Sequence, residues 1–414
     1  MEYQTFSTYR LNKVIRKSDF QKVSVEYHNA YRKKLLKDAT ESVRGNFSDV
    51  TNPLSSFKLD GNQVYKIDKH HHRLIERKLT SNLNSISGKK APNRANIIEN
   101  LKLLLMEDVP YRIYRWDITK FFESFDNEEV ESFINQIPNL SPQSKRLLGS
   151  ILAKHKALGG TGSPRGLSLS SILTELMMCE FDSKISAHPD TFFYARYVDD
   201  IIIITSANES NQRFKHSAEI ILPKGLKFNE LKSKESPIIG KSPTARKQTD
   251  KFVYSFEYLG YKISIKKRTN KDKHRVIDID MADKKVKKYK KRLSRTFYDF
   301  AKNGNTELLI DRLRFLTKNF KVYNQHLDRT KLSGIYYNYP AIQGNMSNLK
   351  DLDGFVKALV IGQKGRLGAL LKAKLNSSLK SRILANSFVK GHEDVAFVTF
   401  RPERVSQIKL CWGY

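Results

Sequence analysis

The chain has 414 residues, of which 39% are hydrophobic and 11% aromatic, with 74 lysines and arginines against 43 aspartates and glutamates. This composition excludes a disordered chain, and the length predicts two or three connected subdomains. The formal net charge of +31 indicates a polyanionic partner, because neutralised phosphates release condensed counterions. Basic residues spread along the whole chain favour nucleic acid over an anionic membrane surface.

The two cysteines, Cys179 and Cys411, lie far apart in the sequence. They give neither a metal-binding spacing nor a disulfide framework, which is typical of a reducing compartment. The first residues lack the apolar segment of a secretion signal, and no apolar run reaches membrane-spanning length. We therefore expect a soluble protein of the cytoplasm.

The first 90 residues are polar and basic, with helical periodicity through Phe20–Leu36 and Leu74–Leu83. Residues Ser85–Asn96 are rich in Ser, Gly, Lys, Pro and Asn and predict a loop. Ile97–Leu105 has apolar residues at helical spacing. The three consecutive histidines, His70–His72, cannot all face one metal ion, so we assign no site to them.

From Tyr111 the pattern becomes that of a sheet. Tyr111–Ile118 predicts a strand with a carboxylate near its end, and Asn127–Ile137 predicts a helix. Residues 166–186 form a second helical stretch that follows a turn rich in Gly, Ser and Pro. Phe192–Thr205 has two apolar runs separated by adjacent aspartates, which indicates a β-hairpin, and Phe252–Ile265 predicts two further strands.

Beyond about residue 280 the strand signals fade, and Lys284–Leu293, Glu307–Phe320 and Leu349–Val360 predict helices. A β-rich middle followed by a helical, basic C-terminal region is the expected architecture. The very basic run Lys284–Arg292 is equally compatible with a solvated helix face and with nucleic-acid contact.

Three aspartates are candidates for a two-metal site. Asp117 ends one predicted strand, and Asp199 and Asp200 lie at the tip of the predicted hairpin. In-line transfer of a nucleotidyl group uses two metal ions, which carboxylates and backbone carbonyls hold. Because adjacent strand residues point to opposite faces, we assign Asp117 and Asp199 to the metals, with the Ile118 carbonyl, and give Asp200 a supporting role. Taken alone, the aspartate pair is equally a common turn.

Five segments, in this order, resemble the palm motifs of reverse transcriptases: Asp117–Phe122, Ser163–Ser171, Tyr197–Asp200, Gly225–Lys232 and Phe256–Tyr261. The resemblance covers residues 111–265. It implies an α+β right-hand polymerase with fingers, a palm with an antiparallel sheet, and an α-helical thumb. The implied domains are 1–110 (N-terminal region and fingers), 111–275 (palm and primer grip) and 276–414 (thumb and C-terminal region). The implied activity is RNA-directed DNA synthesis from deoxynucleoside triphosphates with two Mg²⁺ ions, for which Mn²⁺ can substitute.

The resemblance also implies roles for individual residues. A bulky Phe122 would clash with a ribose 2′-hydroxyl and so select deoxynucleotides, whereas the adjacent Phe121 is expected in the core. Lys232 would protonate or neutralise the departing pyrophosphate, and this role is favoured over that of an ordinary exposed lysine. Arg165 departs from the family, in which glutamine often precedes the glycine. The implied sets are catalytic Asp117, Asp199, Asp200 and Lys232; nucleotide-binding Phe122, Arg165, Gly166 and Arg94; and primer-grip Tyr258, Leu259 and Gly260.

The segments Arg312–Phe320 and Ser333–Pro340 resemble bacterial defence-associated and abortive-infection reverse transcriptases, most of all the A component of type 3 antiphage systems. That resemblance implies a noncoding RNA as template or scaffold, and a second reverse transcriptase as a candidate partner in an oligomer. Two other readings remain open. One is a retron-like or protein-primed, template-independent DNA polymerase. The other is a degenerate polymerase that serves as an RNA-binding assembly subunit, against which the intact Asp117, Asp199 and Phe122 argue.

Overall fold

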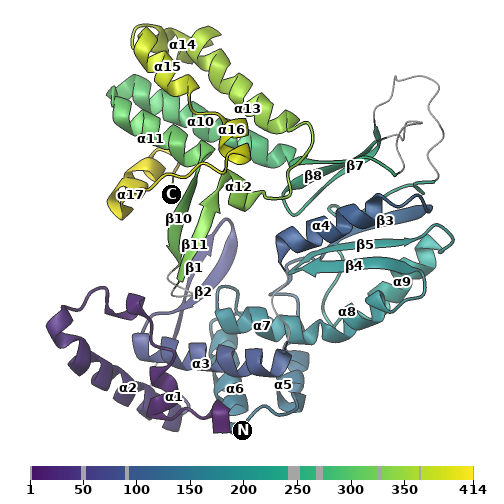
Figure 1. The fold of residues 1–414 in the computed structure, drawn as a ribbon. Helices are drawn as coiled ribbons and strands as arrows, with labels where there is room; N and C mark the ends of the chain where they lie inside the picture. Colours follow the sequence, from purple (N-terminus) through teal and green to yellow (C-terminus); the bar gives the residue numbers. More distant parts are fainter. Residues whose placement is uncertain are drawn as a thin grey trace. The chain divides into compact units, whose positions relative to one another are not determined.

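The computed structural model describes residues 2–47, 53–88, 93–240, 252–266, 274–324, 329–362 and 365–413. Contacts divide the chain into two compact units (Figure 1). The first unit comprises 1–92 and 110–238, and the second comprises 93–109 and 239–414. The division differs from the three expected ranges because the helix at 94–105 and the strands from 252 onward fold with the C-terminal elements. The three functional ranges stay a prediction.

The first unit opens with helices and one hairpin. The helices are η1 (Glu2–Gln4), α1 (Thr8–Asn12), η2 (Lys17–Phe20), η3 (Val25–Tyr27), α2 (His28–Arg44) and α3 (His70–Ser87). Between α2 and α3 lies the antiparallel pair β1 (Leu54–Leu59) and β2 (Asn62–Ile67). The sequence analysis missed this hairpin. Its turn, Asp60–Gly61, has positive φ at both residues, which is the type I′ geometry that joins antiparallel strands.

A four-stranded antiparallel sheet is the centre of the first unit. Its strands are β3 (Tyr111–Asp117), β4 (Thr191–Tyr197), β5 (Asp200–Ser206) and β6 (Lys234–Glu235), in the spatial order β4-β5-β3-β6. The helices of this part are α5 (Asn127–Gln136), α6 (Pro142–Ala157), α7 (Ser168–Met177), α8 (Cys179–Ser186) and α9 (Asn211–Ile220). The expected single helical stretch at 166–186 is therefore two helices, while the strand and the hairpin lie where the pattern predicted them.

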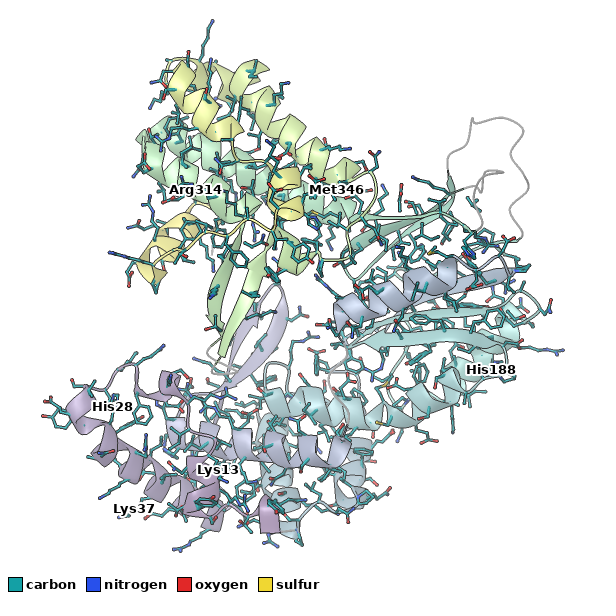
Figure 2. All side chains as sticks on the ribbon, viewed as in Figure 1. Lys13, His28, Lys37, His188, Arg314 and Met346 are labelled. Atoms are coloured by element: carbon teal, nitrogen blue, oxygen red, sulfur yellow. The ribbon has the colours of Figure 1, made fainter. Side chains whose placement is uncertain are left out.

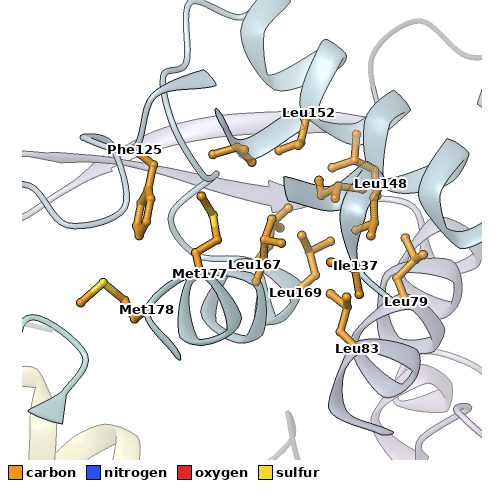
Figure 3. Close-up of a cluster of buried hydrophobic side chains, with 14 of the residues drawn as sticks. Leu79, Leu83, Phe125, Ile137, Leu148, Leu152, Leu167, Leu169, Met177 and Met178 are labelled. Atoms are coloured by element: carbon orange, nitrogen blue, oxygen red, sulfur yellow. The ribbon is translucent and has the colours of Figure 1, made fainter. Parts of the chain in front are cut away.

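One continuous core positions the sheet. Buried Leu79 of α3, Leu148 of α6 and Leu169 of α7 belong to one hydrophobic cluster (Figure 3). The same cluster includes Trp116 and Ile203 of the sheet. Because protein interiors are close-packed, the strand ends that follow these residues are held in a fixed place. The turn between β4 and β5 and the end of β3 thus lie on a rigid support.

The second unit is mainly helical. It contains α4 (Arg94–Leu105), the antiparallel sheet β7 (Phe252–Tyr258), β8 (Tyr261–Lys266) and β9 (Ile277–Met281), and the hairpin β10 (Asn319–Asn324) and β11 (Arg329–Gly334). Its helices are α10 (Asp283–Asn303), α11 (Thr306–Thr317), α12 (Ile335–Asn338), α13 (Ser347–Lys357), a π-helical turn η4 (Ala358–Gly362), α14 (Gly365–Lys372), α15 (Ser377–Leu384), α16 (Phe388–Glu393) and α17 (Pro402–Leu410).

Two features of the second unit differ from the sequence expectation. Helix α11 ends at Thr317, and residues predicted to continue it form strand β10, so strands do occur beyond residue 280. Asn319 begins that strand and is fully buried, with its side-chain amide donating to the carbonyls of Gly391 and Ala396. Long-range hydrogen bonds of this kind override local helix periodicity and do not show in a sequence pattern.

Basic side chains are exposed on both units, as at Lys37 on α2 and Arg314 on α11 (Figure 2). No helix in the part of the chain that the structure describes is long and apolar enough to cross a membrane.

Candidate active site

The predicted aspartates meet at one end of the central sheet. Strands β3 and β5 are antiparallel neighbours, and Asp117 lies directly opposite Asp200. The Ile118 N–H donates to the Asp199 carbonyl at 3.2 Å. Because directly opposed residues share one face of a sheet, the side chains of Asp117 and Asp200 point the same way. Asp199 lies in the turn between β4 and β5. The alternation of side chains along a strand, which was the reason for separating Asp199 from Asp200, therefore does not apply to it. Its assignment as the metal ligand stays a prediction.

The turn that carries Asp199 is strained. Val198 has a φ of 60°, which is unusual for any residue other than glycine and more so for a β-branched one. Such a conformation costs roughly 1–3 kcal/mol and persists only where its surroundings enforce it. Residues held in this way are concentrated at functional sites.

Arg196 supplies that enforcement. Its side chain is 3% exposed and makes two-pronged ion pairs with Glu175 of α7 and with Asp182 of α8. From this fixed position its Nη1 also donates to the Val198 carbonyl at 3.0 Å. Arg196 thus ties the strained turn to two helices. The sequence analysis missed this role, because Glu175 and Asp182 lie outside the motif and their approach depends on the packing of α7 and α8.

The acids crowd one another electrostatically. Burial raises the pKa of Asp199, and the neighbouring Asp117 raises it further. Burial, together with Asp199 and Asp117, raises the pKa of Asp200 to about 6. Carboxylates that raise each other's pKa gain from any cation placed between them.

Lys232 provides one such cation. Its ammonium lies 3.0 and 3.1 Å from the two carboxylate oxygens of Asp117, although its side chain is 64% exposed. The segment before it is fastened to β3, since the Asn229 N–H donates to the Asp117 carbonyl and the Thr119 N–H donates to the Lys227 carbonyl. The Ser233 hydroxyl accepts from the Asp117 N–H. The sequence-predicted lysine is therefore brought directly to the predicted acid.

The donor set fits divalent metal ions. Magnesium usually takes only one or two protein carboxylates and completes its shell with water and substrate phosphates. Asp117 and Asp199 are the predicted pair, and the Ile118 carbonyl stays a predicted further ligand beside them, since the Ile118 N–H donates to the Asp199 carbonyl. Within the described ranges, no three His, Cys, Asp or Glu side chains are grouped closely enough to enclose an ion by themselves. An open site of this kind leaves coordination positions for a nucleotide.

Two of the predicted nucleotide-binding residues, Phe122 and Arg165, contact each other. Phe121 is buried, whereas Phe122 is only partly buried, with the Arg165 guanidinium 5.2 Å from its ring centre. Arg165 also forms a two-pronged ion pair with Glu123, which the sequence analysis did not predict. The nearby Asp199 contributes to the raised pKa of Arg165, after the hydrogen bond and charge of Glu123. Arg165 thus covers Phe122 from a position that Glu123 fixes.

Gly166 has a structural reason to be glycine. Its φ is +105°, and an added Cβ would lie 2.6 Å from the Tyr65 carbonyl oxygen and from Val64 Cγ1. The Tyr65 N–H donates to the Arg165 carbonyl at 2.7 Å. Hairpin β1–β2 is therefore joined to the Arg165–Gly166 turn by close backbone contact.

Arg94 and the predicted primer grip belong to the second unit. The Arg94 guanidinium lies 5.4 and 5.6 Å from the ring centres of Tyr261 and Tyr339 and donates to the Asn338 carbonyl. Leu259 and Gly260, both with positive φ, form the turn between β7 and β8, and Tyr258 is buried. The roles of these four residues in binding triphosphate and primer stay predictions.

The histidine triplet begins helix α3. Tyr31 shares a hydrogen bond with His70, while His72 is fully buried with its ring against Phe47. The two side chains therefore have separate packing partners.

An antiparallel sheet with acids at the end of one strand and on the adjacent hairpin turn, with a lysine on the first acid, is the palm of a nucleotide polymerase. Residues 70–263 match the family "Reverse transcriptase (RNA-dependent DNA polymerase)". The matched region, which is similar to that family, holds all three aspartates. Members of this family use divalent metal ions.

Comparison with solved structures gives similarity to telomerases. Apo telomerase from Candida tropicalis, truncated from its C-terminal domain, matches with a TM-score of 0.34 and 12% identity over 56% of this chain and 58% of that chain. Telomerase from Candida albicans with a TWJ fragment of telomeric RNA matches with a TM-score of 0.37 and 11% identity over 86% and 61%. This chain thus spans less than two thirds of either telomerase chain. Among curated proteins, no sequence matches it.

Proposed function

We propose that the chain is an RNA-directed DNA polymerase that acts by two-metal nucleotidyl transfer with Mg²⁺. The observation that carries the proposal is the meeting of Asp117, Asp199 and Asp200 at one end of the sheet within the matched domain. When bound, the ions stabilise the charge that develops on phosphorus and on the leaving oxygens. Asp117, Asp199 and the Ile118 carbonyl are the residues that would hold them.

The other residues have positioning and selecting roles in this proposal. Arg196 holds the turn, so that Asp199 is aligned before substrate arrives. Phe122 limits the space at the sugar of the incoming nucleotide. Lys232 stands beside Asp117, where its ammonium can neutralise a departing pyrophosphate or give it a proton.

The direct test is primer extension by the purified chain on an RNA template with deoxynucleotides and Mg²⁺ or Mn²⁺. We expect full-length DNA from the wild-type chain and a loss of at least about a thousandfold in the Asp199→Ala, Asp200→Ala double variant. A double variant that retains full synthesis would show that the site is wrongly assigned. RNA binding by the same variant checks that it is folded.

For the biological setting, we propose antiphage defence with a structured noncoding RNA as template and a second reverse transcriptase as partner. The support is the resemblance of Arg312–Phe320 and Ser333–Pro340 to defence-associated enzymes. The test is phage challenge of cells that carry the natural locus, with the wild-type chain or the Asp199→Ala, Asp200→Ala variant, followed by sequencing of co-purifying nucleic acid. Loss of protection and of a defined RNA-templated DNA in the variant is the expected outcome. Undiminished protection would favour an assembly role instead.

A further inference from the structure

The first half of α10 lines a pocket of about 370 Å³ in the second unit. Its lining consists of five cationic side chains and one aromatic residue: Lys287, Lys288, Lys291, Arg292, Arg295 and Trp412. No acidic residue is among them. Pockets of this volume are of the size that takes small ligands or single nucleotides.

Helix geometry explains why the cations gather. At 100° per residue, the five positions lie on one face of α10, whereas the buried Val286, Leu293 and Phe297 lie on the opposite face. The exposed face continues with Lys284, Tyr298 and Lys302, which gives a basic stripe about 27 Å long.

The acids near α10 do not line this pocket. Asp351 pairs with Lys290 at 2.7 Å, Asp283 pairs with Lys262 at 2.8 Å, and Asp299 pairs with Arg312. Burial and then the neighbouring cations, beginning with Lys288, lower the pKa of Lys285 at the edge of the stripe. A concentration of like charge of this kind raises the local concentration of anions.

Trp412 is held in place before any ligand arrives. Its indole N–H donates to the Thr296 hydroxyl at 3.0 Å and to the Arg292 carbonyl at 3.2 Å, and its ring centre lies 5.4 Å from the Arg292 guanidinium. Arg295 donates to the Trp412 carbonyl. The side chain is only 5% exposed. Because Trp412 is already fixed by these hydrogen bonds, ligand binding would cost little side-chain entropy at this side of the pocket.

We propose that this pocket binds the 5′-triphosphate end of an RNA strand. A triphosphate concentrates several negative charges in one place, which matches five converging cations, whereas an internal phosphodiester brings a single charge. The first nucleoside would lie against Trp412, and the following phosphates would lie along the stripe from Lys284 to Lys302. The inference rests on the proposed function for its RNA partner and adds how that RNA is recognised.

The test compares two RNAs of the same sequence, one with a 5′-triphosphate and one with a 5′-hydroxyl, binding to the full chain. We expect the triphosphate to bind about tenfold more tightly. The triple variant Lys287→Ala, Lys288→Ala, Lys291→Ala should lose this preference. It should also reduce the slope of log affinity against log salt by about two, since each single-strand phosphate contact contributes about 0.7.

The matched control removes the same charge elsewhere in the second unit, at the exposed Lys357, Lys372 and Lys374. This control should retain the preference. Equal affinity of the wild-type chain for both RNAs, or equal loss in the two triple variants, overturns the proposal. Competition by free ATP as effective as that of the triphosphorylated RNA would identify a free nucleotide as the ligand and would overturn the RNA assignment.

The outcome is separable from that of the polymerase proposal. The binding preference is measured in the Asp199→Ala, Asp200→Ala variant as well, where no synthesis is expected. A preserved preference in a chain that makes no DNA even as wild type supports the pocket and contradicts the polymerase proposal. DNA synthesis by a wild-type chain that shows no preference for 5′-triphosphate RNA would support the polymerase proposal and contradict the pocket proposal.

Discussion

Phe122 is the residue whose effect is most directly steric. It is partly buried, lies beside the core residue Phe121, and is covered by the Arg165 guanidinium. Its side chain is thus fixed on two sides, which a selecting residue requires. Fixed bulk discriminates against an added hydroxyl far better than a flexible side chain does.

We expect Phe122→Ala to admit ribonucleotides. The ratio of kcat/KM for deoxynucleotides to that for ribonucleotides should fall at least roughly tenfold, mainly because ribonucleotide use rises. Single-nucleotide extension with each triphosphate measures it. Phe125→Ala, a change at a buried core aromatic of the same segment, should lower stability without changing the ratio. Unchanged discrimination in Phe122→Ala would place that side chain away from the sugar.

At the scale of the element, the turn between β4 and β5 depends on helices α7 and α8 through Arg196. We expect Arg196→Lys to lower kcat roughly ten- to hundredfold, because a lysine cannot serve both acids and the Val198 carbonyl together, and small displacements of reacting groups are costly. KM for the nucleotide should change much less. Steady-state primer extension separates the two constants.

Arg112→Lys is the control for that change. Arg112 forms a comparable buried ion pair with Glu209, but it lies at the other end of strand β3 from Asp117. The Arg112→Lys variant should lower the thermal unfolding midpoint about as much as Arg196→Lys does, while its kcat stays within roughly twofold of the wild-type value. Equal effects on kcat would mean that Arg196 acts only through stability.

His155 of α6 makes the first unit sensitive to acid. It is buried against Tyr65 and beneath Gly160, and burial lowers its pKa from 6.5 to about 4. Between these values the unfolded chain binds a proton that the folded chain does not, so stability falls as the pH falls from about 6.5 toward 4. Asp200, with its raised pKa, contributes in the opposite direction.

We therefore expect His155→Gln to lose less stability than the wild type between about pH 7.5 and pH 5. Denaturant unfolding followed by Trp116 fluorescence, in a Trp412→Phe background, reports on the first unit alone. The chain has no other tryptophan. Parallel loss of stability in both proteins would show that His155 already binds its proton in the fold.

Elements with a local signature were predictable from the sequence, and those fixed by distant contacts were not. Strand β3 and hairpin β4–β5 showed alternation, a run of isoleucines and an acid pair at the turn. Hairpin β1–β2 has the turn sequence Asp60–Gly61, which is typical of a two-residue β-hairpin, so this hairpin could have been predicted. Strand β10 carried no such signal. The Arg165–Glu123 pair, like the Arg196 network, joins side chains from separate segments, which sequence order alone does not bring together.

At the scale of the whole molecule, binding and chemistry depend on different charges. The +31 excess is spread over the chain, whereas the acids of the site are confined to one end of one sheet. Chelation of divalent ions should abolish synthesis and leave RNA affinity nearly unchanged. Raising salt from about 50 to 200 mM should weaken binding on the order of three hundredfold if about six single-strand phosphates are engaged.

Fluorescence anisotropy and primer extension on the same samples measure the two effects. Asp117→Asn is the companion variant, expected to bind RNA normally and to make no DNA. Loss of RNA affinity on chelation would mean that metal organises the binding surface as well as the site.

The contact between Lys232 and Asp117 makes the lysine and a metal ion rivals for one carboxylate. The two binding equilibria are therefore linked: the free energy of the Lys232–Asp117 ion pair would be lost when a metal ion binds Asp117, and the affinity for metal would be lower by that amount. Lys232→Met should thus bind Mn²⁺ more tightly by calorimetry while making DNA more slowly. The Lys232 ammonium would then become available to the departing pyrophosphate only when the site beside Asp117 is occupied.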